Sequence, residues 1–157
     1  MKGGQTVEQI IQKYADMVYR LACAQAQNRS DAEDIFQEVF LRYLRSAPEF
    51  ASEEHRRAWL IRVTINCAKK LRASAFVRHT VPLDAELPFE TEESLALYAE
   101  LRRLPAADRA VLHLFYYEDQ RVQEIARLLH KKESTVRSRL TRARQRLKKL
   151  LKETDYV

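Results

Sequence analysis

Apolar residues recur at steps of three and four along the first half of the chain, which is the spacing of one face of an α-helix. The apolar stripe of the first predicted helix consists of Val7, Ile10, Ile11, Tyr14, Val18 and Leu21. A second helix is predicted to begin at Ser30, where Glu33 three residues later would complete a capping box, and to end near Ser46. A third helix is predicted over about residues 53–73, with one apolar side formed by Trp59, Leu60, Val63, Cys67 and Leu71.

The helical periodicity stops over residues 74–93. This stretch contains Pro82 and Pro88, and its five acids outnumber its one base, Arg78; the acids are Asp84, Glu86, Glu90, Glu92 and Glu93. We interpret it as an acidic linker, because unstructured loops of this length are uncommon inside compact domains. A surface loop within a single domain is the alternative.

Periodicity returns after the linker and predicts four more helices, over about residues 94–104, 106–117, 121–129 and 134–151. The predicted fold class is therefore all-α: two small helical domains, residues 1–73 and 94–152, joined by a flexible linker and followed by a short tail, 153–157. Only 2 glycines and 4 prolines occur in the 157 residues, too few turn residues for a β-sandwich or a glycine-rich phosphate loop.

Positive charge is concentrated at the end of the chain. Residues 121–152 contain twelve Lys or Arg residues and two acids, Glu124 and Glu133, whereas the whole chain carries a net charge of +6. The rest of the chain is therefore close to neutral or slightly acidic. A local excess of this size on a short helical module indicates a nucleic acid as the first partner to consider.

The sequence offers no catalytic constellation and no set of metal ligands, so we expect neither an enzyme nor a cofactor. Cys23 and Cys67 lie among apolar helical neighbours without a second cysteine nearby and are interpreted as buried or semi-buried thiols, although a disulfide or metal role stays open. The four histidines are scattered. We find no signal peptide and no apolar run long enough to span a membrane, and we expect a cytoplasmic protein.

The two last predicted helices form a helix-turn-helix unit. The helix over 134–151 presents Val136, Leu140, Ala143 and Leu147 to an interior, and the helix over 121–129 supplies Val122, Ile125, Ala126 and Leu129. In such a motif the start of the second helix enters the major groove. Arg137, Ser138, Thr141 and Arg142 are placed to reach base edges, and Arg139, Arg144 and Lys148 to reach phosphates. A basic, solvated helix that binds an acidic protein, or nothing, is the alternative.

Longer motifs in both halves resemble one family, the extracytoplasmic-function (ECF) sigma factors of bacterial RNA polymerase. The second half resembles region 4 of that family through the string LRRLPAADRAVLHLFYYEDQRVQEIARLLHKKESTVRSRLTRAR. The first half resembles region 2 through NRSDAEDIFQEVFLRYL and RRAWLIRVTINCAKKLR. Two departures stand out: His130 occupies a turn position where the family often has Gly, and Lys70 stands where Asp is common.

The resemblance implies a sigma factor, monomeric when free, that directs the polymerase to promoters. Its implied partners are core RNA polymerase (the β′ clamp helices and the β flap), duplex and single-stranded promoter DNA, and an anti-sigma factor. For the −35 element the implied contacts are Ser134, Thr135, Arg137, Ser138, Arg139, Thr141, Arg142 and Arg144. The acidic linker would thread a cationic polymerase channel and mimic nucleic acid there.

The second predicted helix has two distinct faces. Ile35, Phe36, Val39 and Tyr43 form its buried side, and Asp34, Gln37, Glu38 and Leu41 share the other, an acidic patch around an exposed leucine. An apolar centre with a polar rim suits docking to a partner helix. By resemblance that partner is the β′ clamp; a solvated charged face with one exposed leucine is the alternative.

The third predicted helix buries Leu60, Val63, Cys67 and Leu71 and is expected to leave Arg62, Ile65, Asn66, Lys69 and Arg72 outward. A cationic face with an amide suits melted DNA, and the resemblance implies that it opens the −10 element together with the preceding loop, residues 50–56. The implied −10 contacts are Arg62, Asn66, Lys69, Lys70 and Arg72. Trp59 is expected at the edge of the hydrophobic core rather than as a stacking platform.

Three other functions stay open. A one-component helix-turn-helix regulator would bind duplex DNA alone, and it should dimerise on a palindrome. An adaptor that acts purely through protein contacts, such as an anti-sigma decoy, would not use the Arg137 and Arg142 face. A nucleic-acid enzyme would need clustered acids or metal ligands, which the sequence lacks.

Overall fold

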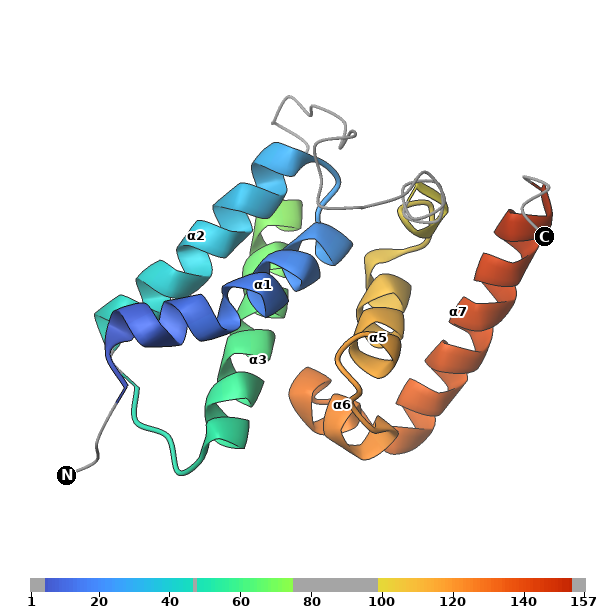
Figure 1. The fold of residues 1–157 in the computed structure, drawn as a ribbon. Coiled ribbons are helices and arrows are strands. Elements are labelled where there is room, and N and C mark those ends of the chain that lie inside the picture. Colours follow the sequence, from blue (N-terminus) through green and yellow to red (C-terminus); the bar gives the residue numbers. More distant parts are fainter. Residues whose placement is uncertain (1–4, 47, 75–98, 154–157) are drawn as a thin grey trace. The chain divides into compact units, whose positions relative to one another are not determined.

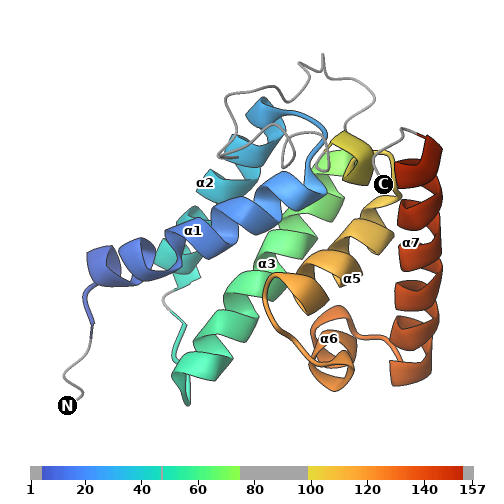
Figure 2. The ribbon, with the colours of Figure 1, turned by 45° about the vertical axis from the view of Figure 1, so that its right-hand side comes forward.

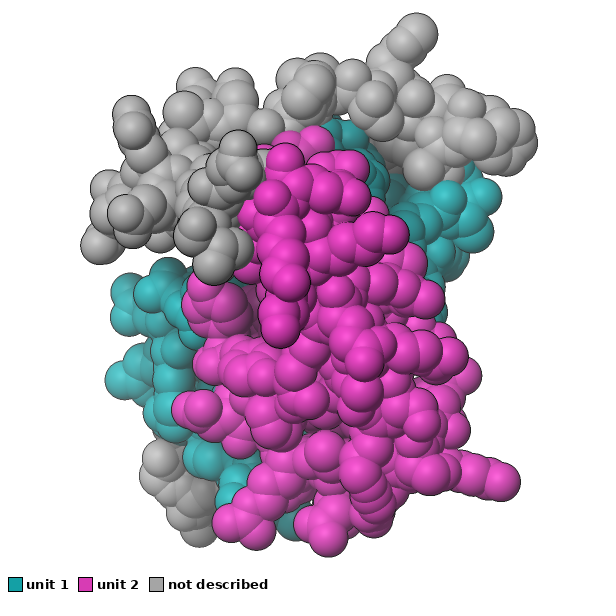
Figure 3. All heavy atoms as spheres, turned by 90° about the vertical axis from the view of Figure 1, so that its right-hand side faces the viewer, with its two compact units in different colours: residues 1–81 teal, residues 82–157 magenta. Residues whose placement is uncertain are grey.

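The computed structural model describes residues 5–46, 48–74 and 99–153. In these ranges, all helices and strands longer than one residue are α-helices. Figure 1 shows the helices α1 (Val7–Gln25), α2 (Arg29–Ser46) and α3 (Glu53–Ala73), followed by α5 (Ala106–Tyr116), α6 (Val122–Leu129) and α7 (Glu133–Glu153). The chain divides into two compact units, residues 1–81 and 82–157, which are coloured separately in Figure 3. The predicted all-α fold is thus confirmed. None of the helices described is long and apolar enough to cross a membrane.

The first unit is a three-helix bundle in which each helix packs against the other two. α2 and α3 run antiparallel, and α1 crosses both of them (Figures 1 and 2). The interior is filled by aliphatic side chains with at most 3% of their surface exposed, among them Val18, Leu21, Ile35, Val39, Leu60, Ile61 and Ile65. Burying this apolar surface, at about 25 cal/mol per Å², is the main force that holds the bundle together.

Side-chain caps start all three helices of this bundle. The Thr6 hydroxyl accepts a hydrogen bond from the Gln9 N–H, and the Gln9 side chain accepts one from the Thr6 N–H, so that α1 begins with a capping box. Ser52 caps α3 by accepting from the His55 N–H at 3.1 Å. Each cap of this kind stabilises a helix by about 1 kcal/mol.

The predicted start of the second helix was wrong. Asn28, and not Ser30, caps α2: its Oδ1 accepts from the Asp31 N–H at 2.8 Å, and its Nδ2 donates to the Asp31 carboxylate at 3.2 Å. The Asn28 carbonyl also accepts the first helical hydrogen bond, from the Ala32 N–H. Asn is as good a cap as Ser, and here its amide supplies a donor and an acceptor on two separate atoms.

The orientation of α3 also differs in part from the prediction. Ile65, expected outward, is 3% exposed and belongs to the hydrophobic core. Arg72, also expected outward, is half-buried, and its guanidinium donates to the backbone carbonyl of Gln25 at 3.2 Å and to its side-chain oxygen at 3.3 Å. α3 packs against both α1 and α2, so its buried arc is wider than the single stripe that periodicity alone predicts.

In the second unit α7 packs against both α5 and α6. Its interior contains Leu104, Val111, Leu114, Ile125, Val136 and Leu140, all 3% exposed or less. The buried Arg109 guanidinium, on α5, donates to the Leu104 carbonyl at 2.5 Å. It thereby satisfies a backbone group in the turn that precedes α5. The predicted stripes of both helix-turn-helix elements are confirmed for Val136, Leu140, Ala143, Ile125 and Ala126, whereas Val122, Leu129 and Leu147 are only partly buried.

Two predictions lie wholly or partly outside the described residues. Of the acidic linker only Ser74 is described, so the mimicry of nucleic acid by residues 74–93 stays a prediction. Of the helix predicted over 94–104, residues 99–101 are helical and residues 102–104 form the turn that leads into α5.

Candidate functional site

The turn between α6 and α7 adopts a backbone geometry that glycine prefers. His130 ends α6 with φ 56° and ψ 48°, in the left-handed region. The Lys131 N–H donates to the Ala126 carbonyl at 2.9 Å and the His130 N–H to the Arg127 carbonyl at 3.4 Å, which satisfies the end of α6. His130, which stands where the family often has Gly, thus has the left-handed backbone that glycine tolerates best. Histidine is less favourable than glycine at this position, because a Cβ in the left-handed region costs about 1 kcal/mol.

The first half of α7 presents polar and basic side chains away from the buried stripe. Ser134, Thr135, Arg137, Ser138, Thr141 and Arg142 are all exposed. The Thr141 hydroxyl donates to the Arg137 carbonyl, and Arg137 makes a long ion pair with Glu133 at 3.5 Å. Within the described part of the chain, Arg142 makes no hydrogen bond or ion pair. Its guanidinium is thus available to an external partner.

Two residues predicted to contact phosphates, Arg139 and Arg144, bind side chains of their own domain. Asp108, 1% exposed at the start of α5, accepts from Arg139 at 3.0 Å and from Arg146 at 2.5 Å. The Arg144 guanidinium lies over the Phe115 and Tyr116 rings, and its Nε donates to the Tyr116 hydroxyl at 2.6 Å. Sequence reasoning missed Asp108. The available signal was an acid in the first turn of an otherwise apolar helix, facing a helix rich in arginine.

The predicted docking residues of α2 lie on its solvent side. Asp34, Gln37 and Leu41 are exposed, and Glu38 is half-buried because it binds Arg42 at 3.0 Å and Arg45 at 4.0 Å. Leu41 is 42% exposed, and Leu44, one turn further on, is 50% exposed. Sequence reasoning missed Leu44, although its spacing of three from Leu41 could have indicated it. The two leucines give this face a larger apolar centre than predicted.

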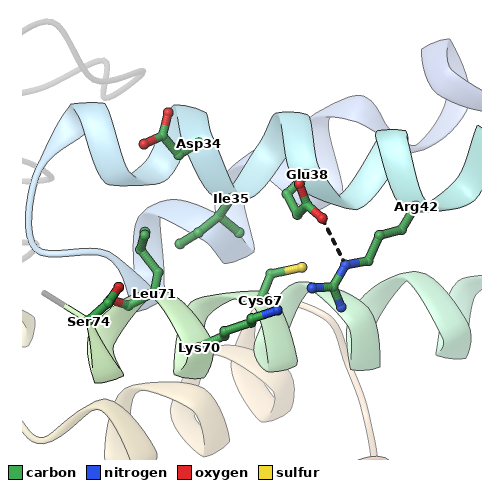
Figure 4. A pocket seen from close by; sticks show the side chains of 8 residues that line it. All are labelled: Asp34, Ile35, Glu38, Arg42, Cys67, Lys70, Leu71 and Ser74. Atoms are coloured by element: carbon green, nitrogen blue, oxygen red, sulfur yellow. Dashed lines mark hydrogen bonds and ion pairs between the residues drawn. The ribbon is translucent and has the colours of Figure 1, made fainter.

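An open groove of about 340 Å³ lies between α2 and α3. It is lined by Asp34, Ile35, Glu38, Arg42, Cys67, Lys70, Leu71 and Ser74, as Figure 4 shows. Arg42 from α2 and Lys70 from α3 extend toward each other on either side of Cys67. Lys70, predicted with the DNA-binding residues, therefore shares a surface with Asp34 and Glu38, two of the predicted polymerase contacts.

The other predicted −10 residues are divided between exposed and restrained positions. Asn66 and Lys69 are exposed on α3, and Arg62 is partly buried. Arg72 is held against Gln25, and its burial lowers the pKa of the guanidinium. Trp59 is partly buried and makes edge contacts with Tyr43 at 5.8 Å and Phe50 at 5.9 Å between ring centres. Its predicted place at the edge of the hydrophobic core is confirmed.

Both cysteines are buried thiols and neither forms a disulfide, as predicted. Burial raises the pKa of Cys23 to about 11 and also raises the pKa of Cys67. The protonated thiol is a poor nucleophile and a poor metal ligand. No cluster of three or more potential metal ligands occurs among residues 5–46, 48–74 and 99–153.

Comparison with known proteins gives matches in both units. Residues 10–75 match the family Sigma-70 region 2, and residues 94–147 match Sigma-70, region 4. The chain is 31% identical over 150 residues to the ECF RNA polymerase sigma factor SigM of Mycobacterium tuberculosis, a match that covers 92% of this chain and 76% of SigM. It is 28% identical over 164 residues to the ECF RNA polymerase sigma factor SigW of Bacillus subtilis, covering 92% and 88% of the two chains.

Solved structures show the same fold at lower identity. The sigma factor RpoE of Bartonella quintana, in complex with the anti-sigma factor NepR, superposes with a TM-score of 0.72 at 20% identity, over 92% of this chain and 96% of that one. CnrH, in complex with the cytosolic domain of CnrY, gives 0.70 at 21% identity over 94% and 88%. The relatives found by sequence are regulatory proteins rather than enzymes. With both regions present and in the family's order, the chain belongs to the extracytoplasmic-function family of RNA polymerase sigma factors.

Proposed function

We propose that this sigma factor directs core RNA polymerase to promoters by binding the −35 element as duplex and the −10 element as a melted strand. The observation that carries the proposal is the face of α7, where Arg142, an exposed arginine without a hydrogen bond or ion pair to any described residue, lies beside Arg137, Ser138 and Thr141. The function divides between residues 1–73, for polymerase docking and −10 capture, and residues 94–152, for −35 recognition. A protein with this function acts in the bacterial cytoplasm.

The geometry and charge of α7 favour binding to duplex DNA. The buried stripe of α7 faces α5 and α6, so its opposite face is free to enter a major groove. An arginine there can donate two hydrogen bonds to a guanine, which discriminates against other bases by about 1–3 kcal/mol. Ser134 and Thr135 lie at the start of the helix, where hydroxyls and backbone N–H groups meet phosphate oxygens.

Arg139 and Arg144 have a positioning role in this proposal, with phosphate contact as a secondary one. Both side chains bind α5, which fixes how far α7 is rotated relative to the rest of its domain. Arg139 keeps about a third of its surface exposed, so a phosphate could approach its outer edge. The specificity of the −35 contact therefore depends on the exposed arginines, while the restrained ones orient the helix that bears them.

For the first unit we propose docking through α2 and strand capture through α3. Leu41 and Leu44 form an apolar centre with Asp34, Gln37 and Glu38 around it, which suits a helix of the polymerase β′ clamp. Asn66 and Lys69 offer an amide and a cation to unpaired bases and backbone, with Arg62 beside them. Opening the duplex costs a few kcal/mol, which binding of the displaced strand would offset.

An anti-sigma factor remains a proposed partner, supported by family membership. Contact of the second unit with the polymerase β flap also remains a proposal. The acidic patch on α2 is one surface for which an anti-sigma factor and the polymerase could compete.

The test is reconstitution with core RNA polymerase on genomic promoter fragments. We expect promoter-specific initiation that requires both units. Tight operator binding by the chain alone, together with no initiation in the presence of core polymerase, would favour the one-component regulator. Arg137→Ala and Arg142→Ala together should abolish −35 selection while leaving the association with core polymerase intact, since neither residue lies in the first unit.

A further inference from the structure

Lys70 and Arg42 are the two cationic side chains that line the groove between α2 and α3. Lys70 is exposed, and within the described part of the chain it makes no hydrogen bond or ion pair. Arg42 is about one-third exposed, and among the described residues its guanidinium forms an ion pair with Glu38 alone, at 3.0 Å. Figure 4 shows the two cationic ends extending toward each other beside the Cys67 sulfur.

The charges of the groove are arranged in a defined order. Asp34 lies at one end, Glu38 is paired with Arg42, and Lys70 completes the opposite wall, while Ile35, Cys67 and Leu71 form an apolar floor. The pKa of Cys67 reflects the same neighbours: burial raises it most, Arg42 and Lys70 lower it, and Glu38 raises it. Both cations are thus close enough to act on one buried atom.

We propose that Lys70 and Arg42 together bind a carboxylate side chain on the polymerase helix that docks on α2, and that Lys70 is therefore a specificity residue of the docking surface. The inference rests on the proposed polymerase docking of α2 and extends that surface across the groove to α3. The docked helix would carry an acid that reaches the space between Arg42 and Lys70. An apolar neighbour of that acid would cover Ile35 and Leu71.

Two observations favour a protein partner over DNA. Asp34 and Glu38 line the same groove and would repel a phosphate backbone, whereas a helix can present a base to them and an acid to the cations. The floor of the groove is apolar, and a phosphate backbone has no side chain to bury there. At about 340 Å³ and open to solvent, the groove suits side chains of an approaching helix better than an enclosed small ligand.

The adjacent Lys69 provides a matched comparison. Both lysines are exposed and on the same helix, but only Lys70 lines the groove. A partner in the groove would distinguish the two residues, whereas melted DNA on the outward face of α3 would depend on Lys69 at least as much as on Lys70. Comparing substitutions of these two adjacent lysines therefore shows whether Lys70 binds a protein or DNA.

The experiment measures binding of the full chain, as wild type, Lys70→Glu, Lys70→Arg and Lys69→Glu, to purified core RNA polymerase without DNA. Lys70→Glu should weaken association at least about tenfold, because like charges across an interface cost more than a lost contact. Lys70→Arg should stay within about twofold of wild type, since it keeps the charge, and Lys69→Glu should do so as well. Circular dichroism and thermal unfolding verify that each variant is folded.

A second measurement follows promoter capture by the assembled holoenzyme at several salt concentrations. If Lys70→Glu binds core polymerase like wild type but reduces capture and lowers the salt dependence by about one counterion, Lys70 is a DNA contact and the inference is overturned. Equal loss of core binding in Lys69→Glu would also overturn it. If wild type itself does not bind core polymerase, the proposed function fails first, and that outcome is distinct from a failure confined to Lys70.

Discussion

The Asp108 carboxylate at the start of α5 and the Arg139 guanidinium on α7 form a hydrogen-bonded ion pair of 3.0 Å across the second unit. Asp108 is 1% exposed, and its second oxygen accepts from Arg146, two turns further along α7. One buried acid thus holds two points of the helix that we propose enters the major groove. We therefore expect the orientation of that helix to depend on a residue that is itself buried.

Replacing Asp108 with Asn should destabilise the second unit by about 1–3 kcal/mol. The change removes the charge that both arginines bind and leaves a buried amide with weaker partners. The loss stays below that of a fully buried pair because Arg139 and Arg146 are 34% and 49% exposed and can be solvated. Urea unfolding measures the difference. Glu124→Gln, on the exposed side of α6, is the control, and an equal effect of the two changes would contradict the positioning role.

Arg142→Ala and Arg144→Ala should differ in their effects on DNA binding. Arg142 makes no hydrogen bond or ion pair to the described residues, so we expect its loss to cost about 1–3 kcal/mol at one −35 base pair and to relax selection there. Arg144 is stacked on Phe115 and Tyr116, so its loss should mainly lower the melting temperature. Binding to a library of −35 sequences measures the first effect. A uniform loss of affinity in Arg142→Ala would identify it as a phosphate contact.

Glu53 makes the stability of the first unit dependent on pH. Tyr14 donates to its carboxylate at 2.6 Å, Lys13 lies 3.2 Å from it, and Arg56 pairs with it. The Tyr14 hydrogen bond is the largest cause that lowers the pKa of Glu53 below its ordinary value. Because the folded pKa is depressed, this contribution is complete above the unfolded pKa of about 4.3 and disappears as pH falls through the folded pKa.

Tyr14→Phe removes that donor and should therefore reduce stability at neutral pH more than at pH 3, by roughly 1 kcal/mol or less for so exposed a carboxylate. Thermal unfolding of wild type and variant between pH 3 and pH 7 measures the difference. In a Glu53→Gln background, where the carboxylate that Tyr14 binds is absent, Tyr14→Phe should show no such pH dependence. A constant difference between wild type and Tyr14→Phe across this range would mean that only packing was lost.

His130→Gly should stabilise the turn of the helix-turn-helix by up to about 1 kcal/mol. Glycine occupies the left-handed region at φ 56° without the clash of a Cβ, although it also raises the entropy of the unfolded chain. His130→Val should have the opposite effect because a β-branched residue is disfavoured there. Chemical denaturation of the two variants measures both. A Gly variant that is no more stable than wild type would show that the imidazole makes a compensating contact.

The sequence predicted the fold class, the two helical halves and most of the buried stripes, because periods of three and four residues report directly which side of a helix faces the interior. It was less informative where one helix packs against two partners. Ile65 and Arg72 on α3 were expected outward, yet α1 and α2 together cover a wider arc of α3 than one stripe. The cap of α2 was misplaced by two residues, since Ser30 and Asn28 are equally good caps by sequence alone.

The family and the helix-turn-helix were determined by the sequence itself, since local motifs and charge identify them without long-range information. Only the tertiary structure decided which charged residues are available to partners. Asp108 and Arg139 are 31 positions apart, and Glu38 and Lys70 are 32 positions apart, so no local pattern relates them. Packing of α5 on α7 occupies Arg139 and Arg146, while packing of α2 on α3 brings Lys70 beside Asp34 and Glu38. A charge acquires its role from its neighbours in space, and these are fixed only when the helices pack.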